Sequence, residues 1–394
     1  MVGRGGEVDE REAAFAVALA GGLGPSGAHR LRRAFGSWRA VVRAAVRREP
    51  CGDARMERML GGVAEALAED APGRERAAAA RAGARVVVTG DDEYPEALAE
   101  IARPPLALFV RGADLRSAWP ALAIVGTRRA SPEGLIAARG LAAEVAEAGL
   151  AVVSGLARGV DTAAHRGALD AAGTTVAVLG SGLDEVYPPE NERLADSIAA
   201  AGAVVSEFPM SRGPRPGQFP SRNRIIAGLS VGVLVVEAGR RSGALITAAR
   251  ALESGREVFA VPGPIDRPGS RGPNGLIKAG AKLVESVADI TEELAPAWGP
   301  FRARGEAAGL AAGGADAPGG PAGGGACVAA QVRSALSSTP LGADAIAERL
   351  ALPVSDVLAA LTELELSGGA RAWPGGRYTS GRGRRSGPKE AVRS

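Results

Sequence analysis

Hydrophobic residues in the middle of the chain form short continuous runs, each followed by a loop of small residues and then by a segment with helical spacing. The first three runs cover residues 122–125, 151–153 and 174–179. Continuous runs of Val, Ile and Leu between amphipathic segments are typical of parallel strands that are buried on both faces. The pattern predicts an α/β fold whose strand-to-helix loops lie along one edge of a parallel sheet.

Further hydrophobic runs add strands to this predicted sheet. Residues 203–207, 231–237 and 257–261 follow the first three runs, and residues 85–89 and 106–111 precede them. The run at 231–237 is the most hydrophobic in the chain, so we expect it at the centre of the sheet.

Two helices are predicted from the segments between these runs. Residues 132–149 have helical spacing, and Gly and Pro within 269–274 predict a loop that leads into a short helix starting at Leu276. The side of the first helix that should face the core carries Leu135, Ile136, Leu141 and Val145.

The loops that follow the first three strands are rich in small residues and should converge at one edge of the sheet. Free N–H groups and the positive end of the helix dipole make such an edge an anion site. The dinucleotide fingerprint is not matched, because Glu185 stands where its third glycine is expected. The loops carry Arg128, Arg129 and Arg158 instead, and arginine binds phosphate well. The small residues at this edge are Gly126, Ser154, Gly155, Gly180, Ser181 and Gly182.

The segment from Phe219 to Arg224 has the composition of a site for single-stranded nucleic acid. Such sites combine an aromatic ring that stacks a base with cations that bind phosphates. We expect an exposed Phe219, with Arg222 and Arg224 in the first turn of a helix, where cations oppose the helix dipole and an anion would compensate them. Two alternatives stay open: Phe219 packs in the core beneath the loop, and Arg222, Asn223 and Arg224 form a helix-capping network.

These motifs together resemble the DprA/Smf family (DNA-processing protein A). The resemblance covers residues 85–295 densely and rests on AIVGTR from residue 123, SGLARGVD from 154, GSGLD from 180, FPSRNRIIAGLS from 219 and SGALITA from 242. It implies an extended Rossmann-like core that binds single-stranded DNA. It also implies a recombination mediator that loads a RecA-type recombinase during natural transformation, works as a homodimer and has no catalytic activity.

Composition limits the kinds of protein that this chain can be. A chain of 394 residues suggests two or three domains, and 47 basic against 44 acidic residues give a net charge of only +3. Cys51 and Cys327 are too few for a disulfide framework or a metal site, and His29 and His165 form no ligand cluster, so no cofactor is expected. The sequence has no signal-peptide pattern and no membrane-spanning run, which predicts a cytoplasmic protein without membrane contact.

Five segments are predicted from composition. Residues 1–80 read as a helical domain that resembles a helix–hairpin–helix or SAM-like module; residues 81–295 form the core, and the Gly/Ala/Pro-rich residues 296–326 form a flexible linker. Residues 327–380 predict a winged-helix domain whose third helix is acidic, which favours protein contact over duplex binding. Residues 381–394 are a basic tail.

The helical domain is open to two interpretations. It contacts DNA or a partner through arginines such as Arg30, Arg32 and Arg33, or it is a cap that packs on the core. Charge on a helix is usually a solvated face, which favours the cap.

Three functions are compatible with these observations. In a mediator that binds single-stranded DNA, five arginines would bind phosphates, Phe219 would stack a base, the loop glycines would let the backbone approach the strand, and Ser154, Ser181 and Asn223 would donate hydrogen bonds. The five arginines are Arg128, Arg129, Arg158, Arg222 and Arg224.

The other two functions are a nucleotide hydrolase and a non-enzymatic adaptor. A Rossmann-like hydrolase needs carboxylates in the crevice for acid–base chemistry, and Asp161, Asp184, Glu207 and Glu237 are candidates by position. Asp161 and Asp184 are more simply read as helix N-caps. An adaptor would work through the helical and winged-helix domains, without the crevice.

Overall fold

The computed structural model describes residues 8–21, 23–294, 331–336, 341–350, 352–353, 357, 360–361, 364, 370–373 and 377–380. The chain divides into two units, residues 1–308 and residues 309–394. The predicted linker at 296–326 and the predicted tail at 381–394 lie outside the described residues.

The first unit is built on a nine-stranded sheet with the order β1-β2-β6-β5-β4-β3-β7-β8-β9. From β6 to β9 along this order, each strand is parallel to the next; the hydrophobic runs predicted the strands from β3 to β8, whereas β9 was not predicted. The chain starts the parallel part at β3 and adds β4, β5 and β6 on one side, then β7, β8 and β9 on the other. The switch point therefore lies between β3 and β7, where open α/β sheets bind their ligands. The strands are β1 (Ala84–Val88), β2 (Ala107–Gly112), β3 (Ala121–Val125), β4 (Ala151–Ser154), β5 (Thr175–Val178), β6 (Ala203–Ser206), β7 (Gly232–Val235), β8 (Glu257–Ala260) and β9 (Lys282–Leu283).

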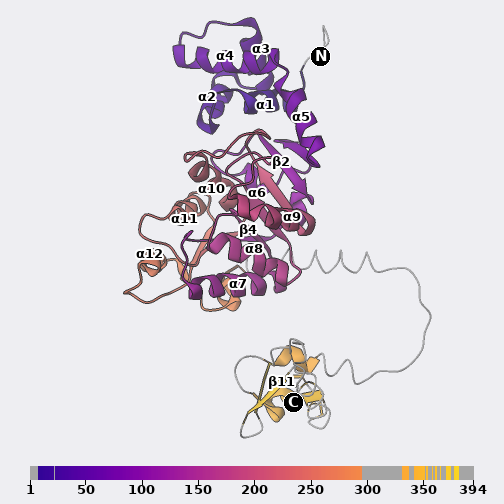
Figure 1. Ribbon diagram of the computed structural model, residues 1–394, viewed down its shortest axis with the longest axis vertical. Helices are drawn as coiled ribbons and strands as arrows, with labels where there is room; N and C mark the ends of the chain where they lie inside the picture. The colour runs from indigo at the N-terminus through magenta and orange to yellow at the C-terminus, as the bar shows by residue number, and fades with distance from the viewer. Residues whose placement is uncertain are drawn as a thin grey trace, which may run out of the picture. The chain divides into compact units, whose positions relative to one another are not determined.

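Both faces of the sheet are buried, because alternate residues of each strand point to opposite sides. In β3, Leu122 and Ile124 pack with α7 and α8, whereas Ala123 and Val125 pack with α10 and α11. The core helices, labelled in Figure 1, are α6 (Glu96–Ala99), α7 (Pro132–Glu147), α8 (Val160–Asp170), α9 (Glu192–Ala201), α10 (Gln218–Gly228), α11 (Gly243–Glu253) and α12 (Arg271–Lys278).

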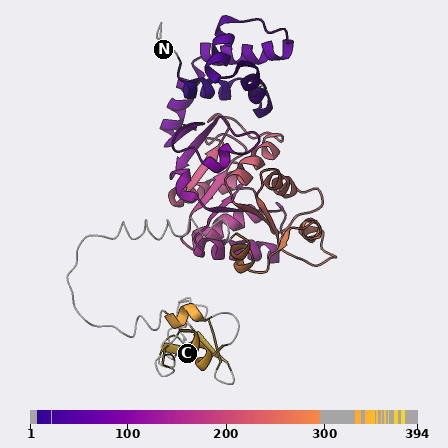
Figure 2. The ribbon, with the colours of Figure 1, turned by 180° about the vertical axis from the view of Figure 1, so that it is seen from behind.

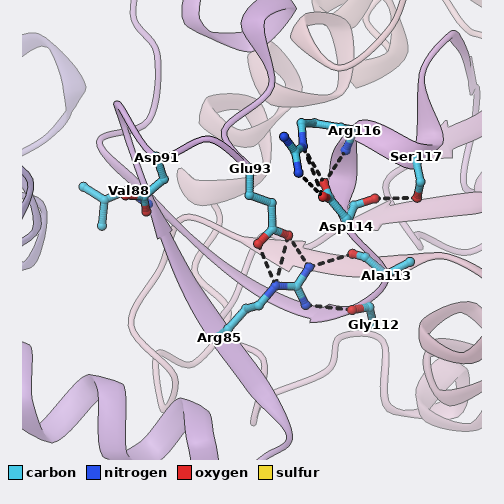
Figure 3. Close-up of polar contacts among 9 residues, drawn as sticks. All are labelled: Arg85, Val88, Asp91, Glu93, Gly112, Ala113, Asp114, Arg116 and Ser117. Atoms are coloured by element: carbon cyan, nitrogen blue, oxygen red, sulfur yellow. Dashed lines mark hydrogen bonds and ion pairs between the residues drawn. The ribbon is translucent and has the colours of Figure 1, made fainter.

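The two strands that precede the parallel part extend the sheet with antiparallel pairs, β1 with β2 and β2 with β6. Figure 3 shows how one side chain fastens this edge: the guanidinium of Arg85 lies between the carboxylate of Glu93 and two carbonyl groups at the end of β2. Its terminal nitrogens donate to the carbonyl oxygens of Gly112 at 2.7 Å and Ala113 at 2.8 Å. The end of β2 is thus tied to β1 by the side chain of Arg85.

The helical domain packs against the β1–β2 end of the sheet (Figures 1 and 2). The rings of Phe15 in α1 and Phe109 in β2 meet edge to face, with centroids 6.1 Å apart. Leu31 and Val41 belong to the same buried cluster, which continues into β2 and β6. Hydrophobic burial against the sheet therefore makes this domain part of the first unit. Its helices are α1 (Glu10–Leu19), α2 (Pro25–Phe35), α3 (Trp38–Arg47), α4 (Ala54–Ala68) and α5 (Ala71–Arg81).

Two helix predictions were wrong in detail. In α7, the residues Leu135 and Ile136 are 37% and 72% exposed, and only Leu141 and Val145 face the core. A helical stripe drawn over four hydrophobic residues was too wide for the side of α7 that the sheet covers. The helix expected from Leu276 starts at Arg271, because a proline in the first turn of a helix has no intrahelical hydrogen bond to lose.

The second unit contains a small antiparallel sheet with the order β10-β12-β11 and the helix α15 (Ala343–Leu350). Its core includes Val357, Leu361 and Leu364, as the hydrophobic spacing predicted. Leu366, also predicted in this core, lies outside the described residues. The strands are β10 (Leu341–Gly342), β11 (Ala370–Trp373) and β12 (Arg377–Ser380).

Across the part of the chain that the structure describes, no helix is both long enough and apolar enough to span a bilayer.

Candidate nucleic-acid interface

An open hollow of about 700 Å³ lies at the carboxyl edge of the sheet, beside the switch point. The loop after β3 contributes Gly126 to Arg129, the loop after β7 contributes Ser242, and α10 closes one side with Phe219 to Asn223. The predicted convergence of the strand-to-helix loops is therefore found. We call this hollow the crevice.

The loops around the crevice are joined to one another by partly buried polar contacts. Glu237, just after β7, accepts hydrogen bonds from the Ser131 hydroxyl at 2.6 Å and the Ser131 N–H at 2.9 Å. The backbone N–H of Thr127 donates to the carbonyl oxygen of Glu237 at 2.7 Å. Ser131 also caps α7. The two loops that diverge at the switch point thus hold each other in place.

The floor of the crevice contains a buried pair of opposite charges, Asp161 and Arg222. Arg222 is 4% exposed and donates to the carbonyl oxygen of Val178. Burial lowers the pKa of Arg222 to about 10, so the guanidinium stays charged at neutral pH. Burial raises the pKa of Asp161 to about 6, although Arg222 and the N–H groups of Ala157 and Gly155 favour its charged form. The floor therefore gains positive charge as the pH falls below about 6.

Two aromatic rings and two arginines form a continuous stack at the mouth of the crevice. The guanidinium of Arg128 lies 5.1 Å from the centroid of the Phe219 ring. The Phe219 and Tyr187 rings are tilted by 56° with centroids 5.6 Å apart, and Arg158 lies 5.9 Å from the Tyr187 ring. Such cation–aromatic contacts stabilise ring orientation. Phe219 is half-buried. This is intermediate between the two alternatives that the sequence left open, an exposed ring and a ring packed in the core.

The predicted arginines differ in how available they are. Arg128 and Arg129 are exposed and line the crevice. Arg158 is bonded to Glu190, with one nitrogen 3.0 Å from a carboxylate oxygen. Arg224 is ion-paired with Glu207 at 2.6 Å, and the side chains of both residues are only 10% exposed. The guanidinium groups of Arg158 and Arg224 therefore have partners within the protein.

The position of the two arginines on α10 also differs from the prediction. The helix starts at Gln218, so Arg222 and Arg224 fall in its second turn and are buried rather than facing an anion at its N-terminus.

The small residues of the loops are surrounded by protein atoms. A Cβ on Gly180 would lie 2.7 Å from the Phe219 ring, and one on Gly155 would overlap the guanidinium of Arg222. Gly126 and Gly182 are equally crowded, by Val160 and by backbone carbonyls. These glycines make room for the stack and the floor, which is a different reason from the backbone approach that the sequence suggested.

The predicted hydrogen-bond donors already have acceptors in the protein. The hydroxyl of Ser154 donates to the carbonyl oxygen of Ile124 and that of Ser181 to the carbonyl oxygen of Glu185, both at 2.6 Å. Asn223, which lines the crevice, donates to the carbonyl oxygen of Gly243 at 3.1 Å. These three side chains shape the loops.

Sequence reasoning missed two residues of the crevice, Tyr187 and Arg215, which both line it. Tyr187 lies in the segment between β5 and α9, and nothing in its spacing indicated that it meets Phe219. Arg215 lies in the Pro/Gly-rich loop before α10, where no periodicity marks a facing direction.

Three of the four carboxylates considered for acid–base chemistry are bonded to other groups of the protein. Glu237 binds Ser131, Glu207 binds Arg224, and Asp161 binds the backbone of the loop after β4. The interpretation of Asp161 and Asp184 as N-caps was wrong, since Gly159 occupies the N-cap position of α8 and Asp184 lies exposed in a turn. Within residues 8–294 and the described parts of the second unit, no group of three or more His, Cys, Asp and Glu side chains could hold a metal.

Comparison with known proteins agrees with this architecture. Residues 85–295 match the family model described as DNA recombination-mediator protein A, and residues 318–376 match the DprA winged helix domain. Protein Smf of Escherichia coli is 43% identical over 302 residues, which cover 74% of this chain and 76% of that protein. DNA processing protein DprA of Streptococcus pneumoniae is 47% identical over 203 residues, covering 52% of this chain and 72% of the relative. The X-ray structure of DprA from the same organism superposes with a TM-score of 0.63 and 36% identity, covering 73% of this chain and 99% of that one.

Proposed function

Because this chain belongs to the DprA/Smf family, we propose that it binds single-stranded DNA in the crevice and acts as a recombination mediator. The stack of Arg128, Phe219 and Tyr187 at the mouth of a cationic hollow is the observation that supports this proposal most. Aromatic rings stack bases of any sequence and arginines bind phosphates, which is how proteins hold single strands without base readout.

The proposal assigns the phosphate contacts to those side chains that are exposed and have no carboxylate partner among the described residues. Arg128, Arg129 and Arg215 are exposed at the crevice and bind phosphates, while Phe219 stacks a base. Arg222 supplies fixed positive charge from the floor. Arg158 and Arg224, which already have carboxylate partners, position the surrounding elements, and so do Ser154, Ser181, Asn223 and the loop glycines.

The test is fluorescence anisotropy of a labelled single strand over a salt series, with duplex DNA as competitor. Arg128→Ala/Arg129→Ala should weaken binding and flatten the salt dependence by about 0.7 per lost phosphate contact. The matched control is Arg166→Ala/Arg193→Ala, which removes the same charge from exposed positions on α8 and α9 outside the crevice. Equal affinity and slope for the two variants would place the DNA site elsewhere and support the adaptor.

A mediator must also act on a recombinase. We propose that the protein, as a homodimer, loads a RecA-type recombinase onto the bound strand during natural transformation. The wild-type protein should shorten the lag of filament assembly on single strands that are already covered by a single-strand-binding protein. Arg128→Ala/Arg129→Ala should not, and sedimentation should give the mass of a dimer.

We propose no catalytic activity, and the hydrolase receives less support from the crevice. Acid–base catalysis needs a carboxylate free to exchange a proton with the substrate. Asp161, Glu207 and Glu237 are each bonded to protein groups. Turnover of any nucleoside monophosphate in a panel, abolished by Asp161→Asn, would reverse this conclusion.

A further inference from the structure

One stretch of the helical domain, between α1 and α4, is rich in arginine and contains almost no acidic residue. Residues 21–48 contain no Asp or Glu, and the first acidic residue after them is Glu49. This imbalance is local, because the chain as a whole carries a net charge of only +3. The arginines in this stretch are Arg30, Arg32, Arg33, Arg39, Arg43, Arg47 and Arg48.

One face of α2 collects two of these arginines beside a hollow. Ser26, His29, Arg30 and Arg33 have the three- and four-residue spacing that places side chains on one side of a helix, and they line a hollow of about 490 Å³. Leu31, on the opposite side, is fully buried. We call this hollow the α2 hollow.

The two arginines of the α2 hollow are exposed and unpaired. Arg32 forms an ion pair with Glu10 at 2.8 Å, but within the described parts of the chain Arg30 and Arg33 have no carboxylate within 4 Å. Asp53 feels the charge of Arg30, but its carboxylate accepts the backbone N–H groups at the start of α4. Two exposed cations at one hollow without a counter-ion favour an anionic occupant.

The α2 hollow is connected to the crevice by shared walls. A hollow of about 350 Å³ lies between them and shares Pro220 with the crevice and Ser26 with the α2 hollow. Its lining includes Arg103, which donates to the Ser26 hydroxyl at 3.0 Å and so joins the core to α2. We call this row of three neighbouring hollows the groove; its lining residues run from Arg128 and Phe219 to Arg33.

We propose that a single strand held in the crevice continues along this groove to α2, where Arg30 and Arg33 bind its phosphates. The inference rests on the proposed function, since it requires a strand in the crevice. Exposed cations stand at the two ends of this groove, while Arg224 and Arg250 in its middle are paired with Glu207 and Glu253. A single strand carries a phosphate at every nucleotide and is flexible enough to contact both ends. The helical domain, which packs on the sheet as a cap, would then also contact DNA through two of its arginines.

The length of the strand provides the test. The full chain is titrated against labelled oligothymidylates of about 8 and about 24 nucleotides, since single folds occupy about 4–16 nucleotides. Arg30→Ala/Arg33→Ala should bind the short strand like wild type. On the long strand its salt slope should fall by about 1.4, which at 0.1 M salt corresponds to roughly 25-fold weaker binding. Arg166→Ala/Arg193→Ala is again the control for lost charge.

The possible outcomes distinguish a failure of this inference from a failure of the proposed function. If wild type binds neither strand, both proposals fail. If wild type binds both strands and the α2 variant matches the control on the long one, only the extension to α2 is overturned. A variant that weakens the short strand as much as the long one, or that loses only duplex binding, would also overturn it, because α2 would then serve a different contact.

Discussion

Replacing Phe219 with alanine separates stacking from electrostatics in the crevice. The ring lies between Arg128 and Tyr187, and removing it takes away a stacking surface without removing any charge. Base–aromatic stacking contributes about 1–3 kcal/mol per base, so affinity for a single strand should fall by roughly 5- to 150-fold. The dependence of affinity on salt should stay the same, because the number of phosphate contacts is unchanged.

The assay is anisotropy with a labelled oligothymidylate at several salt concentrations, for Phe219→Ala and Phe219→Leu. Leucine keeps an apolar side chain over Gly180, where the ring now packs, but offers no aromatic face. Both variants should therefore lose affinity by similar factors, while thermal unfolding should show a smaller loss of stability for leucine than for alanine.

Two results would refute this reasoning. Binding of Phe219→Leu at wild-type affinity would mean that the ring only fills space beneath the strand. A salt slope reduced by about 0.7 in both variants would mean that the ring acts by holding Arg128 in position for a phosphate, and that stacking on a base contributes little.

Three further outcomes are expected. Arg224→Ala should lower the free energy of unfolding in urea by about 3–5 kcal/mol, because it leaves the buried Glu207 without its partner; adding Glu207→Gln should restore part of that loss. Single-strand binding should tighten as the pH falls from 7.5 to 5, because Asp161, whose pKa is raised to about 6, loses its negative charge; Asp161→Asn should remove this dependence in the same titration. Gly180→Ala should weaken binding at every salt concentration without changing the slope, since its Cβ would displace the Phe219 ring.

The parallel part of the sheet was predictable because burial on both faces leaves a clear signature in sequence. A strand covered on both sides has no polar alternation, so 122–125 and 151–153 could be identified from hydrophobicity alone. The direction of β1 and β2 was not predictable, since a hydrophobic run carries no information about its neighbour. Their antiparallel pairing is fixed by tertiary contacts such as Arg85 with the carbonyl groups of Gly112 and Ala113.

Which residues lie at the candidate site was easier to predict than which of them are free to bind a ligand. The sequence correctly predicted that Arg128, Phe219 and Arg222 lie at one crevice, because the loops that follow parallel strands lie at one edge of the sheet. It did not distinguish the exposed Arg128 from the paired Arg224, because pairing depends on where Glu207 lies in space. Tyr187 was missed for the same reason, as its role follows from a ring contact across 32 residues.

The crevice combines a fixed interior with an exposed cationic rim, and this combination suits a protein that must hold any sequence and then release it. Asp161 and Arg222 are buried and bonded to the backbone, so the floor and the ring above it need little reordering when a strand arrives. Arg128 and Arg129 are exposed, and contacts made by exposed cations weaken steeply as salt rises. Under the proposed function, affinity would come from stacking on a preformed ring, and release would be governed by competition for the phosphates. A recombinase that binds the same phosphates would therefore displace the strand from the rim first, with the stacked base leaving last.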